Sequence, residues 1–128
     1  MKKKGFTLVE LVVVVAIIGV LVSLGYTNYQ TSMARARDGK RKGDLEQIRS
    51  ALEMYRTDNQ KYPAGNLVSG DSIGSYLIIP NDPSAGKQYS YTGTANSYIV
   101  CAALEKESGN ATGCGSCVVT CNYSIPNP

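Results

Sequence analysis

Residues 5–26, GFTLVELVVVVAIIGVLVSLGY, decide the fold of this chain. Within residues 8–25, only Glu10 and Ser23 have side chains that are neither apolar nor glycine. As a helix this stretch would be about 27 Å long, and the two residues before it extend it to the roughly 30 Å of a bilayer's hydrocarbon core. The segment therefore predicts a single helix that crosses a membrane.

A basic leader precedes the apolar segment. Lys2, Lys3 and Lys4 account for the whole formal charge of +3, and the positive-inside rule places them on the cytoplasmic side. A conventional export signal has small residues for cleavage after its apolar run, and no such pattern follows this one. The only small-residue break lies before the run, at Gly5. Cleavage there would leave the apolar segment in the mature protein.

Glu10 is the one charged residue inside the apolar segment. A carboxylate near the end of a membrane helix costs about 1–3 kcal/mol. Either it reaches the headgroups and has no partner, or it awaits a positive group. Cleavage after Gly5 would create such a group, the α-amine of Phe6, about one helical turn away. An ion pair in lipid is much stronger than one in water, so this pair could select how one subunit docks beside another.

These features together resemble the class III signal of type IV pilins and type II secretion pseudopilins. The resemblance rests on the basic leader, the Gly5-Phe6 pair, Glu10 and the apolar run to Leu21. It implies cleavage by a prepilin peptidase between Gly5 and Phe6, N-methylation of Phe6, and a role for Glu10 in registering an incoming subunit. It also implies other copies of the chain, an inner-membrane platform protein and a cytoplasmic assembly ATPase as partners.

Beyond Gly25 the pattern changes to that of an amphipathic helix, predicted to continue the first helix from Phe6 to about Asp58. Residues 44–63 also resemble the family, with a helix end followed by an N-x-x-Y-P turn. Whether the helix unwinds between Gly19 and Gly25 stays open. The apolar residues recur three and four apart in two series, Tyr26, Tyr29, Met33 and Ala36, then Leu45, Ile48, Leu52 and Tyr55.

Residues 35–42 contain five basic side chains in eight. The simplest interpretation is a solvated helix face, paired in part with Asp38, Asp44 and Glu46. The alternatives are contact with anionic lipid, complementary charge between subunits, and capture of DNA. Aromatic residues, which nucleic-acid sites interleave with basic ones, are missing from this stretch, so nucleic acid is not an expected partner.

The C-terminal half is expected to form a small antiparallel sheet of three or four strands that packs on the helix. Strand-like runs lie at 88–92, 97–104 and 117–125. The predicted fold class is therefore α+β, the pilin fold. The expected parts are a leader (1–5), a transmembrane half of the helix (6–25), an amphipathic half (26–60) and a disulfide-stabilised β-rich head (61–128).

Four cysteines lie in the last 28 residues, and so small a core behind an export signal favours disulfides. If the last two predicted strands form a hairpin with its tip near Gly109, Cys101 can face Cys121, which leaves Cys114 to bridge Cys117. The alternative is a zinc site built from all four, although the sequence has only one C-x-x-C pair.

Catalysis and a bound cofactor are not expected. The chain has no histidine, which excludes Ser-His-Asp and Cys-His nucleophiles and mixed His/Cys zinc sites. Major pseudopilins of the family bind calcium in an acidic C-terminal loop. After Asp82 only Glu105 and Glu107 remain as acidic residues, so no metal is predicted.

The sequence thus favours a structural, non-enzymatic subunit of a type IV pilus, anchored in a bacterial inner membrane and then assembled into a cell-surface filament. The disulfide-prone C-terminus and the missing calcium loop favour the pilus. The alternatives are a type II secretion or competence pseudopilin, and a single-pass anchored domain that holds zinc without polymerising. Open questions are whether the subunit is major or minor, and whether its filament serves adhesion, motility, DNA uptake or secretion.

Overall fold

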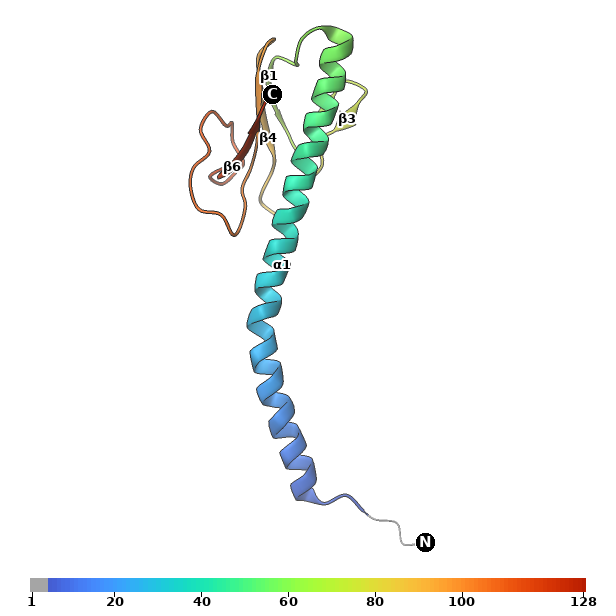
Figure 1. The fold of residues 1–128 in the computed structure, drawn as a ribbon, viewed down its shortest axis with the longest axis vertical. Helices are drawn as coiled ribbons and strands as arrows, with labels where there is room; N and C mark the ends of the chain where they lie inside the picture. Colours follow the sequence, from blue (N-terminus) through green and yellow to red (C-terminus); the bar gives the residue numbers. More distant parts are fainter. Residues whose placement is uncertain (1–4) are drawn as a thin grey trace. The chain divides into compact units, whose positions relative to one another are not determined.

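The computed structural model describes residues 5–128 (Figure 1); apart from Gly5, the predicted leader lies outside the described residues. The chain forms two compact units, one up to Met33 and one from Ala34 to Pro128, called the C-terminal unit below. Helix α1, Leu8–Asn59, contributes to both. The predicted long helix is confirmed, with small shifts at its two ends.

The apolar segment is unburied in the first unit. An 18-residue window of α1 has a mean hydropathy of 2.8, and none of that window is buried within the chain. The helix is therefore long and apolar enough to cross a membrane. Tyr26 and Tyr29, members of the first apolar series, are also exposed. Amphipathic tyrosines at the end of an apolar helix suit the boundary between hydrocarbon and water.

In the C-terminal unit a four-stranded antiparallel sheet, in the order β1-β4-β5-β6, packs against α1 (Figure 1). A separate two-stranded hairpin is formed by β2 and β3. The runs predicted at 88–92 and 97–104 are confirmed as β4 and β5, whereas the third strand begins later than predicted, and β1 and the hairpin were not predicted. The strands are β1 Gly65–Val68, β2 Ser72–Ile73, β3 Leu77–Ile78, β4 Ser90–Gly93, β5 Tyr98–Ala102 and β6 Tyr123–Pro126.

The core lies between α1 and the sheet. Leu45, Ile48 and Leu52 of the second apolar series are fully buried there. Four almost completely buried tyrosines surround them, and each hydroxyl group bonds to an acceptor, as buried polar groups require. The pairs are Tyr62 with Glu53 at 3.0 Å, Tyr89 with Asp44 at 2.6 Å, Tyr91 with the Pro63 carbonyl at 2.5 Å, and Tyr98 with Glu53 at 3.2 Å.

All four cysteines form disulfides, but the predicted pairing is wrong. The bonds join Cys101 to Cys114 and Cys117 to Cys121. The predicted hairpin exists as β5 and β6, yet its register places Cys101 opposite Ser124. Cys121 therefore lies ahead of β6 and does not face Cys101. With every sulfur bonded to another sulfur, no thiolate remains for the alternative zinc site.

Candidate functional site

A capping box opens the apolar helix. The Thr7 hydroxyl accepts a hydrogen bond from the Glu10 backbone N–H at 3.2 Å. The Glu10 Oε2 atom in turn accepts from the Thr7 backbone N–H at 2.9 Å and from its hydroxyl at 2.7 Å. These reciprocal bonds satisfy N–H groups that a helix start leaves without partners. They explain why α1 begins at Leu8 and not at the predicted Phe6.

The three residues predicted for processing and assembly lie together at the start of this helix. Gly5 and Phe6 are exposed, with 77% of the Phe6 surface accessible, and Glu10 is exposed as well. The capping box uses Oε2 of Glu10, whereas Oε1 accepts no hydrogen bond from the side chains and backbone that the structure describes. One carboxylate oxygen therefore remains available for a partner outside the described chain.

The basic stretch contains a buried residue, which corrects the prediction of a solvated helix face. Arg41 is 0% exposed and is held by three carboxylates. Its Nε and Nη2 donate to the two oxygens of Asp82, each at 2.8 Å, while Nη1 donates to Asp38 at 2.7 Å and to Glu105 at 2.9 Å. A further bond from Nη2 to the Ser84 hydroxyl, at 2.8 Å, satisfies the fifth donor. We call these residues the Arg41 cluster.

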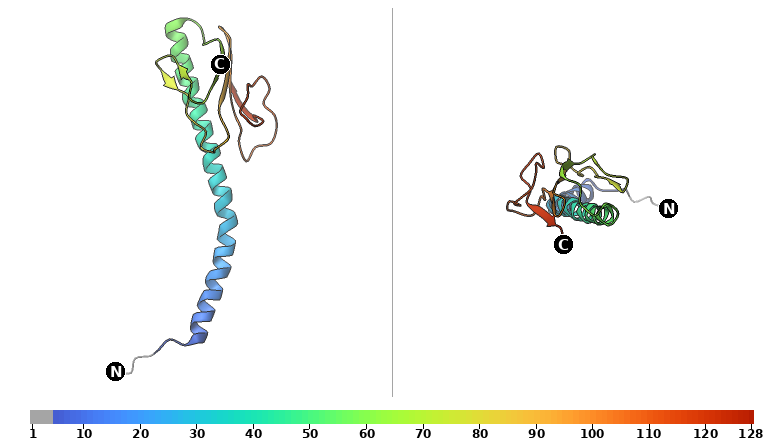
Figure 2. Two further views of the ribbon diagram at one scale, coloured as in Figure 1. Left: turned by 180° about the vertical axis from the view of Figure 1, so that it is seen from behind. Right: turned by 90° about the horizontal axis from the view of Figure 1, so that it is seen from above.

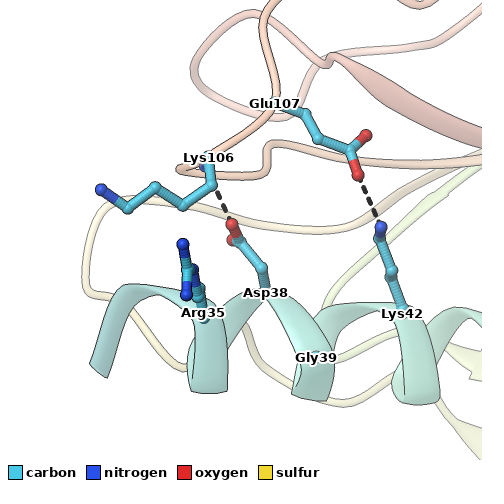
Figure 3. A pocket seen from close by; sticks show the side chains of 6 residues that line it. All are labelled: Arg35, Asp38, Gly39, Lys42, Lys106 and Glu107. Atoms are coloured by element: carbon cyan, nitrogen blue, oxygen red, sulfur yellow. Dashed lines mark hydrogen bonds and ion pairs between the residues drawn. The ribbon is translucent and has the colours of Figure 1, made fainter. Parts of the chain in front are cut away.

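Other basic residues of the stretch extend the same contact between α1 and the loop after β5. Arg37 forms a two-pronged ion pair with Glu105 at 2.8 and 2.6 Å. Figure 3 shows Lys42 of the helix bonded to Glu107, at 2.5 Å. It also shows Asp38 next to the backbone of Lys106, and the Asp38 carboxylate accepts a hydrogen bond from the Lys106 N–H at 2.9 Å. The helix is thus fixed to the loops around Asp82 and Glu105 by charge as well as by apolar packing.

We expect the C-terminal unit to lose stability in acid, because the Arg41 cluster depends on ionised carboxylates. Hydrogen bonds from Arg37, opposed by burial and reinforced by Arg41, lower the pKa of Glu105 from 4.5 to about 2. Because the folded-state pKa lies below the unfolded value, the stabilisation is complete above pH 4.5 and is lost as pH falls toward 2. We expect the unfolding midpoint of a Glu105→Gln variant to fall less over this pH window than that of the unaltered chain.

A matched control is Glu46→Gln, which removes an exposed carboxylate lying 3.8 Å from Arg49. Its acid profile should follow that of the unaltered chain. Equal profiles for all three proteins would contradict the assignment of acid sensitivity to Glu105.

A metal-binding group is not found in the described part of the chain. Among residues 5–128, no group of three or more cysteine and carboxylate side chains lies in an arrangement that could hold a metal ion. The carboxylates of Asp38, Asp82 and Glu105 converge on the Arg41 guanidinium instead. The described features that bear on function are an exposed apolar helix start and an ion-paired contact between α1 and the loops around Asp82 and Glu105.

These features define a pilin-like protein, in which a long apolar helix carries a small disulfide-bonded sheet. Residues 1–26 match the prokaryotic N-terminal methylation motif, and residues 28–116 match the family described as type II secretion system (T2SS), protein G. The second match covers most of the chain. The chain belongs to the type II secretion system protein G family.

Curated relatives named type II secretion system core protein G support this assignment. The Vibrio cholerae protein is 40% identical, with 88% of each chain covered. The Escherichia coli K12 protein is 36% identical over 72% of this chain and 61% of its own length, and the Dickeya chrysanthemi protein is 33% identical over 72% and 58%. The chain thus spans less than two thirds of the latter two relatives. No solved structure matches it significantly.

Proposed function

We propose that this chain is a structural, non-enzymatic subunit of a type II secretion pseudopilus. In this proposal a prepilin peptidase cleaves between Gly5 and Phe6, the new amine of Phe6 is methylated, and the apolar segment drives polymerisation. The family membership supports the secretion pseudopilus over the type IV pilus subunit that the cysteine-rich C-terminus had favoured.

The unburied apolar window of α1 is the observation that carries this function. A surface of this length and hydropathy needs lipid or other protein as its environment. Before assembly, the bacterial inner membrane would supply lipid. After assembly, neighbouring copies of the same helix would supply protein, because apolar helices bury their surface by bundling together. The platform protein and the cytoplasmic ATPase would drive the transfer between the two environments.

Processing is the first prediction of this function. Intact mass and N-terminal peptide analysis of the protein from its native host should show a chain that begins at methylated Phe6. Expression in a strain without the peptidase should preserve Met1 and the three lysines. A chain cleaved after the apolar segment would contradict the proposal, because nothing would remain to anchor or polymerise the subunit.

Secretion distinguishes the pseudopilus from a surface pilus. Deleting the gene for this chain should trap exported proteins inside the cell envelope and leave any surface pili in place. Loss of surface pili with normal secretion would favour the pilus subunit instead. Electron microscopy and analysis of the culture medium measure the two outcomes.

A further inference from the structure

The C-terminal unit exposes few large hydrophobic side chains, and two of them are adjacent in the chain. Over residues 34–128, all of which the structure describes, four such side chains are exposed: Met54, Ile78, Val118 and Val119. Ile78 belongs to the β2–β3 hairpin. The two valines belong to a five-residue ring that the Cys117–Cys121 disulfide closes. Surface hydrophobes that cluster on a small polar domain mark contact sites more often than isolated ones do.

The ring is a rigid knob. Its first residue is fixed by a hydrogen bond from the Gln88 backbone N–H to the Cys117 carbonyl at 3.3 Å, and its last by one from the Ala111 N–H to the Cys121 carbonyl at 2.8 Å. Val118 has a φ of 69°, a left-handed conformation that a β-branched residue rarely adopts. The ring thus holds Val118 and Val119 outward, with exposures of 62% and 45%, although the backbone is strained.

The β2–β3 hairpin provides a hollow of about 510 Å³ with no charged residue in its lining. In the hairpin register Ile73 pairs with Leu77 and is buried, while Ile78 is 67% exposed. The floor of the hollow is fixed to the end of α1. The ring of Tyr76 packs edge-on against Tyr55 at 5.9 Å, and its hydroxyl donates to Asp58. The lining residues are Ser72, Gly74, Ser75, Tyr76, Leu77 and Ile78.

The two surfaces lie apart on the C-terminal unit. In Figure 1 and in the left view of Figure 2 the hairpin with β3 and the orange loop that leads to β6 lie on different sides of α1, and in the view from above the loop lies at one end of the unit and the hairpin lies over the helix. Surfaces placed this way do not meet within one chain. A knob and a hollow at separate places instead allow each copy to contact the next, which is the heterologous arrangement that builds open helical polymers.

We propose that the Val118–Val119 knob of one copy docks in the β2–β3 hollow of the neighbouring copy in the filament. The inference rests on the proposed function, since it names a contact between the units that the polymer brings together. The knob is apolar, and the lining of the hollow, which includes two serines and a tyrosine, has no charged residue, so burial of this contact needs no ionic partner. The fixed ring and hairpin lose little conformational entropy on docking, which favours a contact even of modest area.

Photocrosslinking in assembled filaments tests this contact. A benzophenone amino acid replaces Val119 in one population of subunits, which assembles together with unaltered subunits labelled with ¹⁵N. After irradiation, reduction and trypsin digestion, the peptide of residues 107–128 should be joined to a labelled peptide of residues 62–87, which contains the hollow. A crosslink to any other peptide or protein, in normal filaments, would overturn the docking inference and leave the proposed function intact.

Charge substitution provides a second readout. Val119→Glu and Ile78→Lys should each reduce filament yield about tenfold or more, because each buries an unpaired charge, and the double variant should recover most of the yield. Met54→Glu is the matched control, since it charges an exposed side chain outside both surfaces and should assemble normally. Filaments of normal yield from both single variants would overturn the contact. If the unaltered chain forms no filament, both the contact and the proposed function fail.

Discussion

Replacing Arg41 by methionine is expected to lower the free energy of unfolding of the chain by about 3–5 kcal/mol. Methionine keeps much of the side-chain volume but removes all five donors of the guanidinium. The Asp82 carboxylate, whose side chain is also 0% exposed, would then be buried without a positive partner. A buried charge without a partner costs far more than the net contribution of the intact pair, so removing one member has a large effect.

The measurement is denaturant unfolding of the full chain in detergent micelles. Near-UV circular dichroism of the buried tyrosines reports on the C-terminal unit, and no tryptophan signal interferes. Arg37→Met is the matched control, because that side chain is 33% exposed and its ion pair with Glu105 should contribute about 1 kcal/mol or less. Equal stability of the two variants would show that the Arg41 cluster does not hold the helix against the sheet.

The helix could be predicted from the sequence because its signals are local. An unbroken apolar run and a three- and four-residue spacing each appear within a short window. That spacing places Leu45, Ile48 and Leu52 on one face of the helix, and all three are fully buried. The helix begins at Leu8 and not at the predicted Phe6 because of the capping box. The sequence already contains the signal for it, since Thr7 and Glu10 stand at the separation that defines this motif.

The burial of Arg41 is not predicted from the sequence, although Arg41 lies on the same face of the helix as the buried apolar residues. Counting back from Leu45, the buried stripe of α1 continues through Arg41, Asp38 and Ala34. A charged residue on an apolar stripe is normally interpreted as solvated, and its burial depends on partners that local sequence does not show. Asp82 lies 41 residues away and Glu105 lies 64 residues away. Burial of this arginine is therefore a property of the tertiary structure.

The β-rich part was only partly predictable for a related reason. Strands β2 and β3 have two residues each, which is too short for alternation to be recognised. The disulfide pairing depends on strand register, and a shift of a few residues changes which cysteines face each other. The register observed, with Cys101 opposite Ser124, cannot be derived from the number and spacing of the cysteines alone.

Replacing Glu10 by glutamine is expected to reduce filament assembly about tenfold or more while membrane insertion stays normal, as expected for loss of one ion pair in lipid. Glutamine can still accept the Thr7 hydrogen bonds, so the capping box survives and only the charge is lost. If Glu10 serves the incoming subunit, Glu10→Gln and Glu10→Ala should fail alike. Quantitative immunoblotting of sheared filaments and of membrane fractions measures both steps.

Thr7→Ala is the complementary variant, because it disrupts the role of the Glu10 carboxylate in the helix cap and not its role as a charge. This variant removes the hydroxyl that bonds Glu10 at 2.7 Å and leaves the charge in place. Loss of the cap should cost about 0.5–2 kcal/mol locally, a small loss for a helix that lipid or neighbouring copies also stabilise, so filaments should form. Normal assembly of Glu10→Gln together with failure of Thr7→Ala would reverse the interpretation. Glu10 would then be a capping residue, and its Oε1 atom would have no part in joining subunits.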